Sequence, residues 1–408
     1  MRIVIFEKEE QLKVGGIVIH NQRLKDHLKK LGHQVKIIRF SNENINSSEV
    51  TTIPYYLAEK RTYIFLPQEN TKELVKNELE KFKPDIVHFC VGISPFDFFI
   101  PLLCHALKIP VVGIWHSDLP PHEDTINLLL KSIYLAYLPV CKQLDSLIVF
   151  TPRLRDFYVK KGIKNSRVNI IPNGINCQTY APGTSSLQAR FGKTTNILFL
   201  ARITLVKNPE TLIEAFRELN LPQTRLIIAG TGDLEEELKE RYKKDRRIIF
   251  TGLISNEKHK VDLLRASQIF VLPSKHEGMS LSLLEAMSCG LACIATNAGG
   301  NSDLLGKAGI IVDTNNLESE LPLALKILLQ HREFQKVLGR EARNRVLLNF
   351  EEEKTFNKYL ALYERVIGQF KKEGPPKAIS QELYSVFRNK FKNLWKKAKN
   401  FGENYLLG

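Results

Sequence analysis

Short apolar runs alternate with amphipathic stretches along the first 171 residues of the chain. Buried strands of a parallel sheet are continuous apolar runs, and the helices that connect them carry an apolar face every three to four residues. Strands are predicted at residues 1–6, 34–40, 85–91, 110–115, 145–150 and 167–171. Helices are predicted at residues 17–31, 71–82, 95–107, 124–139 and 152–161. Residues 41–70 are predicted to be irregular, apart from a short strand at 63–66.

The same alternation restarts after a turn at residues 172–176 and a polar stretch that reaches residue 193. Strands are predicted at residues 195–200, 224–229, 247–250, 268–272, 291–295 and 309–312. Helices lie between them, and three more, at 317–330, 333–348 and 352–371, precede Pro375 and Pro376. Two such runs predict an α/β protein with two doubly wound, Rossmann-like domains.

The composition fits that architecture and narrows the class of protein. The chain has 408 residues, of which 43% are hydrophobic and 25% charged, which suits two globular domains. No apolar run approaches the length of about 18 residues that a transmembrane helix needs, and the first residues do not resemble a signal peptide. The six cysteines form no C-x-x-C pair, so we expect reduced thiols in a cytoplasmic protein.

The formal net charge of +15 favours an anionic partner, such as a phosphorylated substrate, nucleic acid or an acidic membrane surface. No zinc-finger spacing, RNP-like aromatic motif or P-loop pattern is present in the sequence. We therefore expect no nucleic-acid partner.

Residues 272–303 carry the densest group of candidate functional positions. Glu277 follows a predicted buried strand, Gly278 comes next, and Glu285 falls in the second turn of a predicted helix. The free N–H groups at that helix start, on Met279, Ser280 and Leu281, would form an anion site between the two carboxylates. Such an order suits a sugar at Glu277, a diphosphate at the helix start and a ribose at Glu285. The alternative is a solvated helix start with two surface carboxylates.

The segment from Glu277 to Glu285 resembles the E-x7-E motif of the retaining glycosyltransferases of family 4, and the resemblance continues through Gly300. It covers roughly residues 1–370 and implies the GT-B fold, in which two Rossmann-like domains face a cleft. The implied organisation is an acceptor-side domain at residues 1–180, a nucleotide-sugar domain at 181–350, and a crossover helix at 351–374. A basic extension at 375–408 lies outside the resemblance.

Glycines at three further places match the family pattern. Gly15 and Gly16 resemble the glycine loop that contacts the donor, although a tight turn without a ligand is the alternative. Gly230 and Gly232 resemble a turn that lines the nucleotide pocket, and a plain turn is equally compatible. The pair at 299–300 fits a close approach to the donor. None of these makes a G-x-G-x-x-G motif, so a Rossmann dehydrogenase is not supported.

Three charged or titratable residues follow predicted strands. Arg202 and Lys207 come after the strand at 195–200, where a diphosphate would lie, and the alternative is a solvated basic loop. His116 follows the strand at 110–115. The resemblance implies that this histidine faces the donor sugar near its reactive carbon, whereas a lone histidine in such a place is more often structural.

The resemblance implies a retaining hexosyltransferase that uses a UDP- or GDP-linked sugar and has His116, Arg202, Lys207 and Glu277 as its catalytic set. Glycines 15, 16, 230, 232 and 278 and residues 279–281 and Glu285 would bind the donor. The sequence contains no D-x-D motif, so neither a metal nor another cofactor is expected. A GT-B epimerase or phosphorylase and a non-catalytic sugar-nucleotide-binding protein are the alternatives.

Residues 380–408 have the pattern of a basic amphipathic helix. Its apolar positions recur every 3.6 residues at Leu383, Phe387, Phe391, Leu394, Ala398 and Phe401. Such a helix is typical of a membrane interface, and it predicts a peripheral protein at the anionic inner face of the membrane. The acceptor would then be a lipid or a lipid-linked glycan. The alternatives are a helix that packs on the first domain, and a soluble or polysaccharide acceptor.

Overall fold

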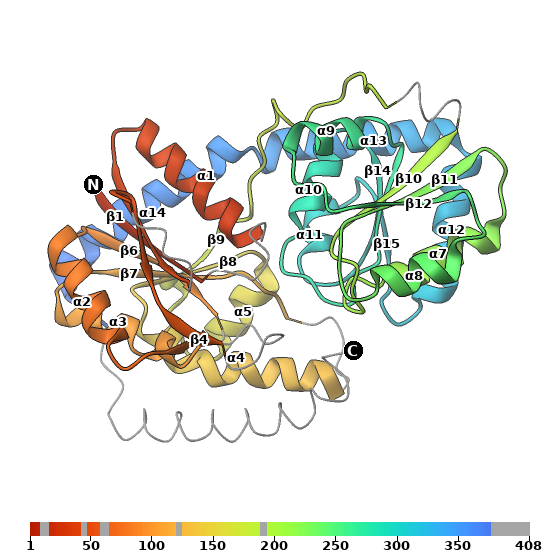
Figure 1. Cartoon of the computed structure of the whole chain (residues 1–408). Coiled ribbons are helices and arrows are strands. Elements are labelled where there is room, and N and C mark those ends of the chain that lie inside the picture. Colours follow the sequence, from red (N-terminus) through yellow and green to blue (C-terminus); the bar gives the residue numbers. More distant parts are fainter. Residues whose placement is uncertain are drawn as a thin grey trace. The chain divides into compact units, whose positions relative to one another are not determined.

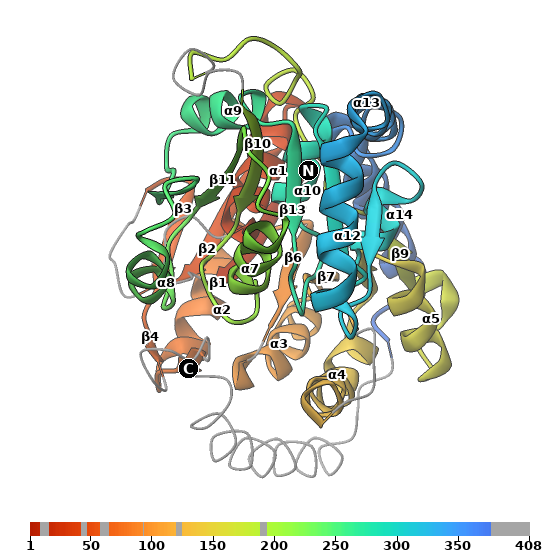
Figure 2. The ribbon, with the colours of Figure 1, turned by 90° about the vertical axis from the view of Figure 1, so that its right-hand side faces the viewer.

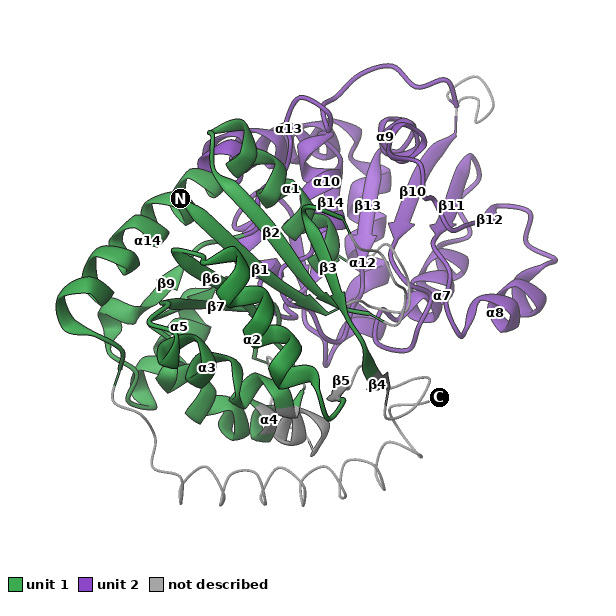
Figure 3. Ribbon diagram, turned by 60° about the vertical axis from the view of Figure 1, so that its left-hand side comes forward, with its two compact units in different colours: residues 1–119, 123–172, 355–408 green, residues 120–122, 173–354 purple. Residues whose placement is uncertain are grey.

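The computed structural model describes residues 1–8, 16–41, 47–57, 65–92, 94–119, 125–187 and 194–376 (Figure 1). The chain divides into two compact units, which Figure 3 colours separately. The first unit comprises Met1–Leu119, Glu123–Pro172 and Thr355–Gly408, and the second comprises Pro120–His122 and Asn173–Lys354. Each unit contains a parallel β-sheet with helices packed on its faces (Figure 1).

The first unit is built on a seven-stranded parallel sheet with the strand order β3-β2-β1-β6-β7-β8-β9. Its strands are β1 (Arg2–Lys8), β2 (Gln34–Phe40), β3 (Val50–Ile53), β6 (Ile86–Val91), β7 (Val111–Trp115), β8 (Ser146–Val149) and β9 (Val168–Ile170). Its helices are α1 (Gly16–Lys30), α2 (Thr71–Phe82), η1 (Pro95–Phe98), α3 (Ile100–Ala106), α4 (Thr125–Gln143) and α5 (Pro152–Lys160). Helix α14 (Glu352–Glu373) joins this unit from Thr355 onward.

The six strands predicted for the first half are all confirmed, whereas the irregular segment predicted at 41–70 is wrong in part. Strand β3 adds to the sheet edge beside β2, and β4 (Tyr55–Leu57) pairs with β5 (Phe65–Pro67) in a separate antiparallel ribbon. The predicted strand at 63–66 overlaps β5, although its first two residues lie outside the described ranges. Strand β3 was missed because it has four residues, two of them threonine, and carries no continuous apolar run.

The second unit is built on a six-stranded parallel sheet with the order β12-β11-β10-β13-β14-β15. Its strands are β10 (Thr195–Leu200), β11 (Thr224–Ala229), β12 (Ile248–Gly252), β13 (Ile269–Leu272), β14 (Ala292–Thr296) and β15 (Ile310–Val312). Its helices are α7 (Pro209–Leu219), α8 (Glu235–Tyr242), α9 (Glu257–Arg265), α10 (Leu281–Ser288), α11 (Asn301–Leu305), α12 (Leu317–Gln330) and α13 (Arg332–Asn349). Each predicted strand of this half is confirmed within two residues at either end.

One face of the second sheet is covered by α7 and α12, which lie side by side (Figure 2). Phe216 of α7 and Leu325 of α12 are buried against Ile197 and Phe199 of β10. Fully burying one such side chain contributes roughly 1.5–3 kcal/mol, so this layer fixes the start of α7 relative to β10. The loop between them, which holds Arg202 and Lys207, is thereby anchored at both ends.

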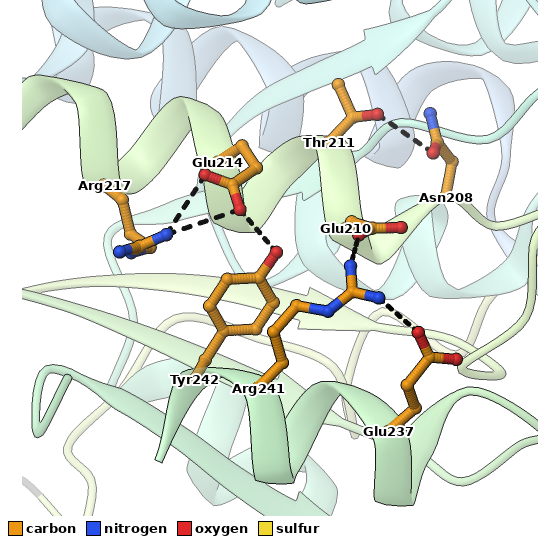
Figure 4. A network of polar contacts seen from close by, with 8 residues as sticks. All are labelled: Asn208, Glu210, Thr211, Glu214, Arg217, Glu237, Arg241 and Tyr242. Atoms are coloured by element: carbon orange, nitrogen blue, oxygen red, sulfur yellow. Dashed lines mark hydrogen bonds and ion pairs between the residues drawn. The ribbon is translucent and has the colours of Figure 1, made fainter. Parts of the chain in front are cut away.

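A polar network on the surface links α7 to α8 (Figure 4). Arg241 pairs with Glu210 and Glu237, and the Tyr242 hydroxyl donates to Glu214 at 2.5 Å. Exposed ion pairs of this kind contribute little, typically less than about 1 kcal/mol each. Buried apolar side chains, rather than these exposed ion pairs, therefore hold α7 and α8 in place.

Helix α14 packs on the first unit through a row of aromatic side chains, Phe356, Tyr359 and Tyr363. The Tyr363 hydroxyl lies 2.7 Å from His88 Nδ1 on the central strand β6. The Tyr359 hydroxyl, four residues earlier on the same helix, is buried and has no hydrogen-bond partner among the described residues. The two tyrosines thus share burial and helix but differ in hydrogen bonding.

Replacing Tyr363 by phenylalanine should lower the free energy of unfolding by about 1–3 kcal/mol, because it leaves His88 Nδ1 buried without a partner. Replacing Tyr359 by phenylalanine should leave the stability unchanged or raise it slightly, because no hydrogen bond is lost. Urea denaturation of both variants measures the difference. Equal losses would show that the Tyr363–His88 bond does not contribute to docking α14.

Candidate active site

The candidate site in the second unit is centred on Glu277, in the loop between β13 and α10. Its side chain is almost fully buried, and Oε1 accepts from Lys207 Nζ at 2.7 Å and from Ser274 Oγ at 2.7 Å. No described residue donates to Oε2. The structure therefore brings together two residues that the sequence placed in one site, Glu277 and Lys207, and leaves one carboxylate oxygen available.

The glycine pair at 299–300 shapes this loop through backbone contact. Gly299 has φ +55°, and a Cβ atom on it would lie 2.2 Å from the Glu277 carbonyl oxygen. The Gly300 N–H donates to the Gly278 carbonyl oxygen at 2.7 Å. Only glycine fits against the backbone here. The backbone contact with Glu277 accounts for a glycine at 299, and the predicted approach of the pair to the donor stays a prediction.

Helix α10 begins immediately after this loop with its donors open. Ser280 is the N-cap residue, and its Oγ accepts from the Leu283 N–H at 3.3 Å. Asn173 Nδ2 donates to the Met279 carbonyl oxygen at 2.9 Å and so fixes the chain just before the helix. The backbone N–H groups of Met279, Ser280 and Leu281 have no acceptor among the described residues. They form the type of helix start that binds anions.

Glu285 lies in the second turn of α10 and is also buried. Its Oε1 accepts from Lys260 Nζ of α9 at 2.5 Å. Lys260 also lies over the ring of Tyr180, 5.3 Å from the centroid, and the Tyr180 hydroxyl donates to Glu257 at 3.1 Å. Lys260 is not among the residues predicted from the sequence, since nothing in the sequence relates a lysine on the preceding helix to Glu285, 25 residues later.

Arg202 is exposed in the loop after β10, and the glycines at 230 and 232 support that loop. A Cβ atom on Gly230 would lie 1.9 Å from the Ala201 carbonyl oxygen, and one on Gly232 would lie 2.3 Å from that of Ile203. Both glycines are therefore needed where the backbone passes the residues on either side of Arg202. Their predicted role in lining a nucleotide pocket stays a prediction.

Three candidate residues, Gly15, Gly16 and His116, belong to the first unit. Gly15 lies outside the described residues, and Gly16 is the first residue of α1. His116 follows β7, and its ring lies 5.8 Å from that of His20 and 5.6 Å from that of Phe150. His116 is partly exposed as a residue, but its Nε2 atom is buried and has no partner among the described residues.

Two histidines of this unit, His20 and His88, pack against aromatic side chains of α14, and His116 lies beside His20. Burial lowers the pKa of His20 to about 4, with a smaller effect from the charge of Arg23. Burial also lowers the pKa of His88 to about 3, with His20 adding to the shift. The pKa of His116 lies well below its usual value for the same reason, reinforced by the other two histidines. At neutral pH, His116 can therefore offer a neutral imidazole to a hydrogen-bond partner.

Both halves of the chain match models of known protein families. Residues 14–179 match the family model described as Glycosyltransferase Family 4, and residues 187–345 match the model described as Glycosyl transferases group 1. The chain belongs to this glycosyltransferase family. The second model contains every candidate residue of the second unit, from Arg202 to Glu285.

Two of the following three curated relatives, those of Streptococcus pneumoniae and Escherichia coli, have names that include a lipid. Sulfoquinovosyl transferase SQD2 of Arabidopsis thaliana is 23% identical over 84% of this chain and 69% of its own length. Alpha-monoglucosyldiacylglycerol synthase of Streptococcus pneumoniae is 24% identical over 72% of this chain and 71% of its own. The UDP-Gal:alpha-D-GlcNAc-diphosphoundecaprenol alpha-1,3-galactosyltransferase of Escherichia coli is 30% identical over 48% of this chain, a match that spans about half of that relative, 54%.

Solved structures share the fold. Sucrose-phosphate synthase from Thermosynechococcus elongatus aligns with a TM-score of 0.71 at 21% identity, over 90% of this chain and 99% of that one. The Anabaena protein HepE in complex with UDP-glucose aligns with a TM-score of 0.69 at 15% identity, over 89% and 98%. The predicted GT-B fold is thus confirmed.

The buried histidines predict a stability that falls in acid. Their folded-state pKa values lie below the unfolded value of 6.5, so below that pH the unfolded chain binds protons that the folded unit does not. At pH 5, His20 would lower the free energy of unfolding by about 2 kcal/mol relative to pH 7.5. Urea denaturation at both pH values measures the loss, and His20→Gln should reduce it.

Comparison of that variant with the wild type isolates the histidine from Asp97, whose burial raises its pKa to about 6 and opposes the trend between pH 6 and 4. The matched control is His259→Gln, which removes an exposed histidine of the second unit. A pH dependence unchanged by His20→Gln would contradict the assignment of a buried neutral imidazole.

Proposed function

We propose that this glycosyltransferase moves a hexose, with retention of configuration, from a UDP- or GDP-linked sugar to a lipid or lipid-linked glycan. The observation that carries the proposal is the pair of buried carboxylates on either side of an open helix start. Each carboxylate is held by a lysine through Oε1, at 2.7 Å for Glu277 and 2.5 Å for Glu285. This order of groups matches the order of groups in a nucleotide-diphosphate sugar.

In this assignment, the diphosphate accepts hydrogen bonds from the N–H groups of Met279, Ser280 and Leu281. Glu285 accepts from the ribose hydroxyls, and Lys260 positions its carboxylate. Glu277 accepts from the sugar hydroxyls through Oε2, the oxygen that has no described partner. Lys207, which pairs with Glu277 Oε1, also provides a cation for the diphosphate. Arg202 adds a second cation on the same loop.

In this reaction, the protein stabilises the negative charge of the leaving group and does not supply a nucleophile of its own. The bond from the sugar C1 to the diphosphate oxygen breaks, and the acceptor oxygen bonds to C1 on the same face. The acceptor proton passes to a diphosphate oxygen, and Lys207, Arg202 and the helix start stabilise the charge that grows there. His116 would contact the donor sugar with its neutral imidazole, since its pKa lies well below the usual value. No metal takes part in this scheme.

The lipid acceptor rests on two observations. Relatives are named for diacylglycerol and diphosphoundecaprenol substrates, and the chain ends in the basic amphipathic pattern of residues 380–408. That segment lies outside the described residues. Within the described part of the chain, no helix is both long and apolar enough to cross a membrane. We propose a peripheral location at the cytoplasmic membrane face, where such acceptors are presented.

The reaction is tested by release of nucleoside diphosphate from UDP- and GDP-sugars in the presence of lipid extract. Lys207→Met and Arg202→Met should each lower turnover by about 100-fold or more, because they remove charge that stabilises the leaving group. Lys258→Met, which removes an exposed lysine of α9, is the matched control and should keep wild-type turnover. Wild-type turnover in both site variants would rule out the assignment of the leaving-group site.

The division of roles between the two carboxylates is tested by calorimetry with UDP and with a UDP-sugar. Glu285→Gln and Lys260→Met should weaken both ligands, because both contain the ribose. Glu277→Gln should weaken the nucleotide sugar by about tenfold more than UDP, a difference of about 1.4 kcal/mol. Glu236→Gln on exposed α8 is the control. Equal losses for the two ligands in Glu277→Gln would contradict a contact with the sugar.

Membrane attachment is tested by flotation with vesicles of anionic and of neutral lipid. The full chain should float with anionic vesicles, and a chain that ends at Gly374 should float far less, because each basic residue near such a surface contributes roughly 1 kcal/mol. Flotation should also decrease with added salt. If both chains float equally, or neither floats, the C-terminal segment is not the membrane anchor.

A further inference from the structure

A basic cavity of about 500 Å³ opens in the first unit, at the amino ends of β1 and β2. Arg2 is the first residue of β1, and Lys36 is the third residue of β2. The last turns of α2 add Glu78, Lys81 and Phe82. The hydroxyl side chains of Ser47, Ser48 and Thr51 complete the lining. Figure 3 shows β1, β2, β3 and α2 within the first unit.

Arg2 is the group that most clearly lacks a partner. Its guanidinium lies over the Phe82 ring, 4.9 Å from the centroid, and its Nε atom is buried without an acceptor among the described residues. Its backbone N–H, by contrast, donates to Asp85 at 2.7 Å. A buried donor without an acceptor is unfavourable, so an acceptor supplied by a ligand would stabilise this site.

The other charges of the cavity leave it positive. Lys36 is 8% exposed, and its Nζ pairs with Glu78 Oε2 at 2.5 Å. Thr51 Oγ1 donates to the same oxygen at 3.1 Å, so the one carboxylate of the lining is already neutralised within the cavity. Lys81 is exposed and forms no ion pair with a described residue. Arg2 and Lys81 therefore contribute two positive charges that the described residues of the lining do not balance.

We propose that this cavity binds a phosphate monoester. A guanidinium fixed against an aromatic ring offers paired donors that match two phosphate oxygens, and Lys81 adds a point charge. The Ser48 hydroxyl can supply a further hydrogen bond. The volume exceeds that of phosphate alone, so the ester carries a small organic group, either in a soluble metabolite or in a lipid headgroup.

This site is distinct from the proposed substrate site. Ligands of open parallel sheets bind at the carboxyl ends of the strands, whereas Arg2 and Lys36 lie at the amino ends. The ligand is therefore an effector or an anchoring headgroup and not the donor. The proposal does not depend on the assignment of Glu277 and Glu285.

Calorimetry of the full chain with glycerol 3-phosphate, and with glycerol as the uncharged control, tests the soluble form. Arg2→Gln and Lys81→Gln should each weaken glycerol 3-phosphate by tenfold or more. Lys76→Gln, which removes the same charge from an exposed position of α2, should change it by less than twofold. Glu78→Gln should strengthen binding, because Glu78 is the one negatively charged residue among the described residues of the lining.

Flotation with phosphatidylcholine vesicles, with and without phosphatidic acid, tests the lipid form with the same four variants. If Arg2→Gln and Lys81→Gln lose flotation with phosphatidic acid and Lys76→Gln does not, the ligand is a lipid headgroup. If the same two variants lose affinity for glycerol 3-phosphate in calorimetry and Lys76→Gln does not, the ligand is soluble. Equal losses in all three lysine and arginine variants, or no binding of either probe, overturn the proposal. Lys81 is exposed, so Lys81→Gln keeps the test valid if Arg2→Gln fails to fold. Turnover of the donor should stay at the wild-type level in Arg2→Gln and in Lys81→Gln.

Discussion

The ion pair between Lys207 and Glu277 is the interaction on which the candidate site of this glycosyltransferase depends. Both side chains are largely removed from water, at 17% and 8% exposure, and a buried pair of this kind adds little net stability. The pair instead contributes to the site by fixing the positions of its two charged groups. Ser274, the backbone contact of Gly299 and the anchored start of α7 all hold the two groups, so the charges are in place before a ligand arrives.

A second pair, between Lys260 and Glu285, repeats that arrangement on the far side of the helix start. In both pairs the lysine contacts one carboxylate oxygen, which keeps the carboxylate oriented and leaves the other oxygen without a donor among the described residues. The open N–H groups between the pairs provide positive potential without a mobile cation. Preorganised donors of this kind need no rearrangement when negative charge develops on a leaving group.

Much of the fold could be predicted because parallel strands buried on both faces leave long apolar runs, such as Thr195–Leu200 and Gln34–Phe40. Short edge strands leave no such run, which is why β3 was missed. Glu277 and Glu285 could be found because a glycine, a strand and a helix start fix their spacing locally. Lys260 could not, since its pairing with Glu285 arises only when α9 packs beside α10. The backbone contacts of the glycines at 230 and 299 could not be predicted from the sequence, because they involve residues 22–29 positions away in the chain, and their predicted contact with a donor stays a prediction.

The most direct test of the central claim is amide hydrogen exchange of the full chain with and without a nucleotide sugar that it turns over. The proposed site predicts slower exchange in peptides that cover the loop after β10, residues 273–285 and the part of α9 that contains Lys260. Exchange at the amino ends of β1 and β2 should not change. If the nucleotide sugar protects none of the peptides around Met279–Leu281, the donor does not bind at the paired carboxylates.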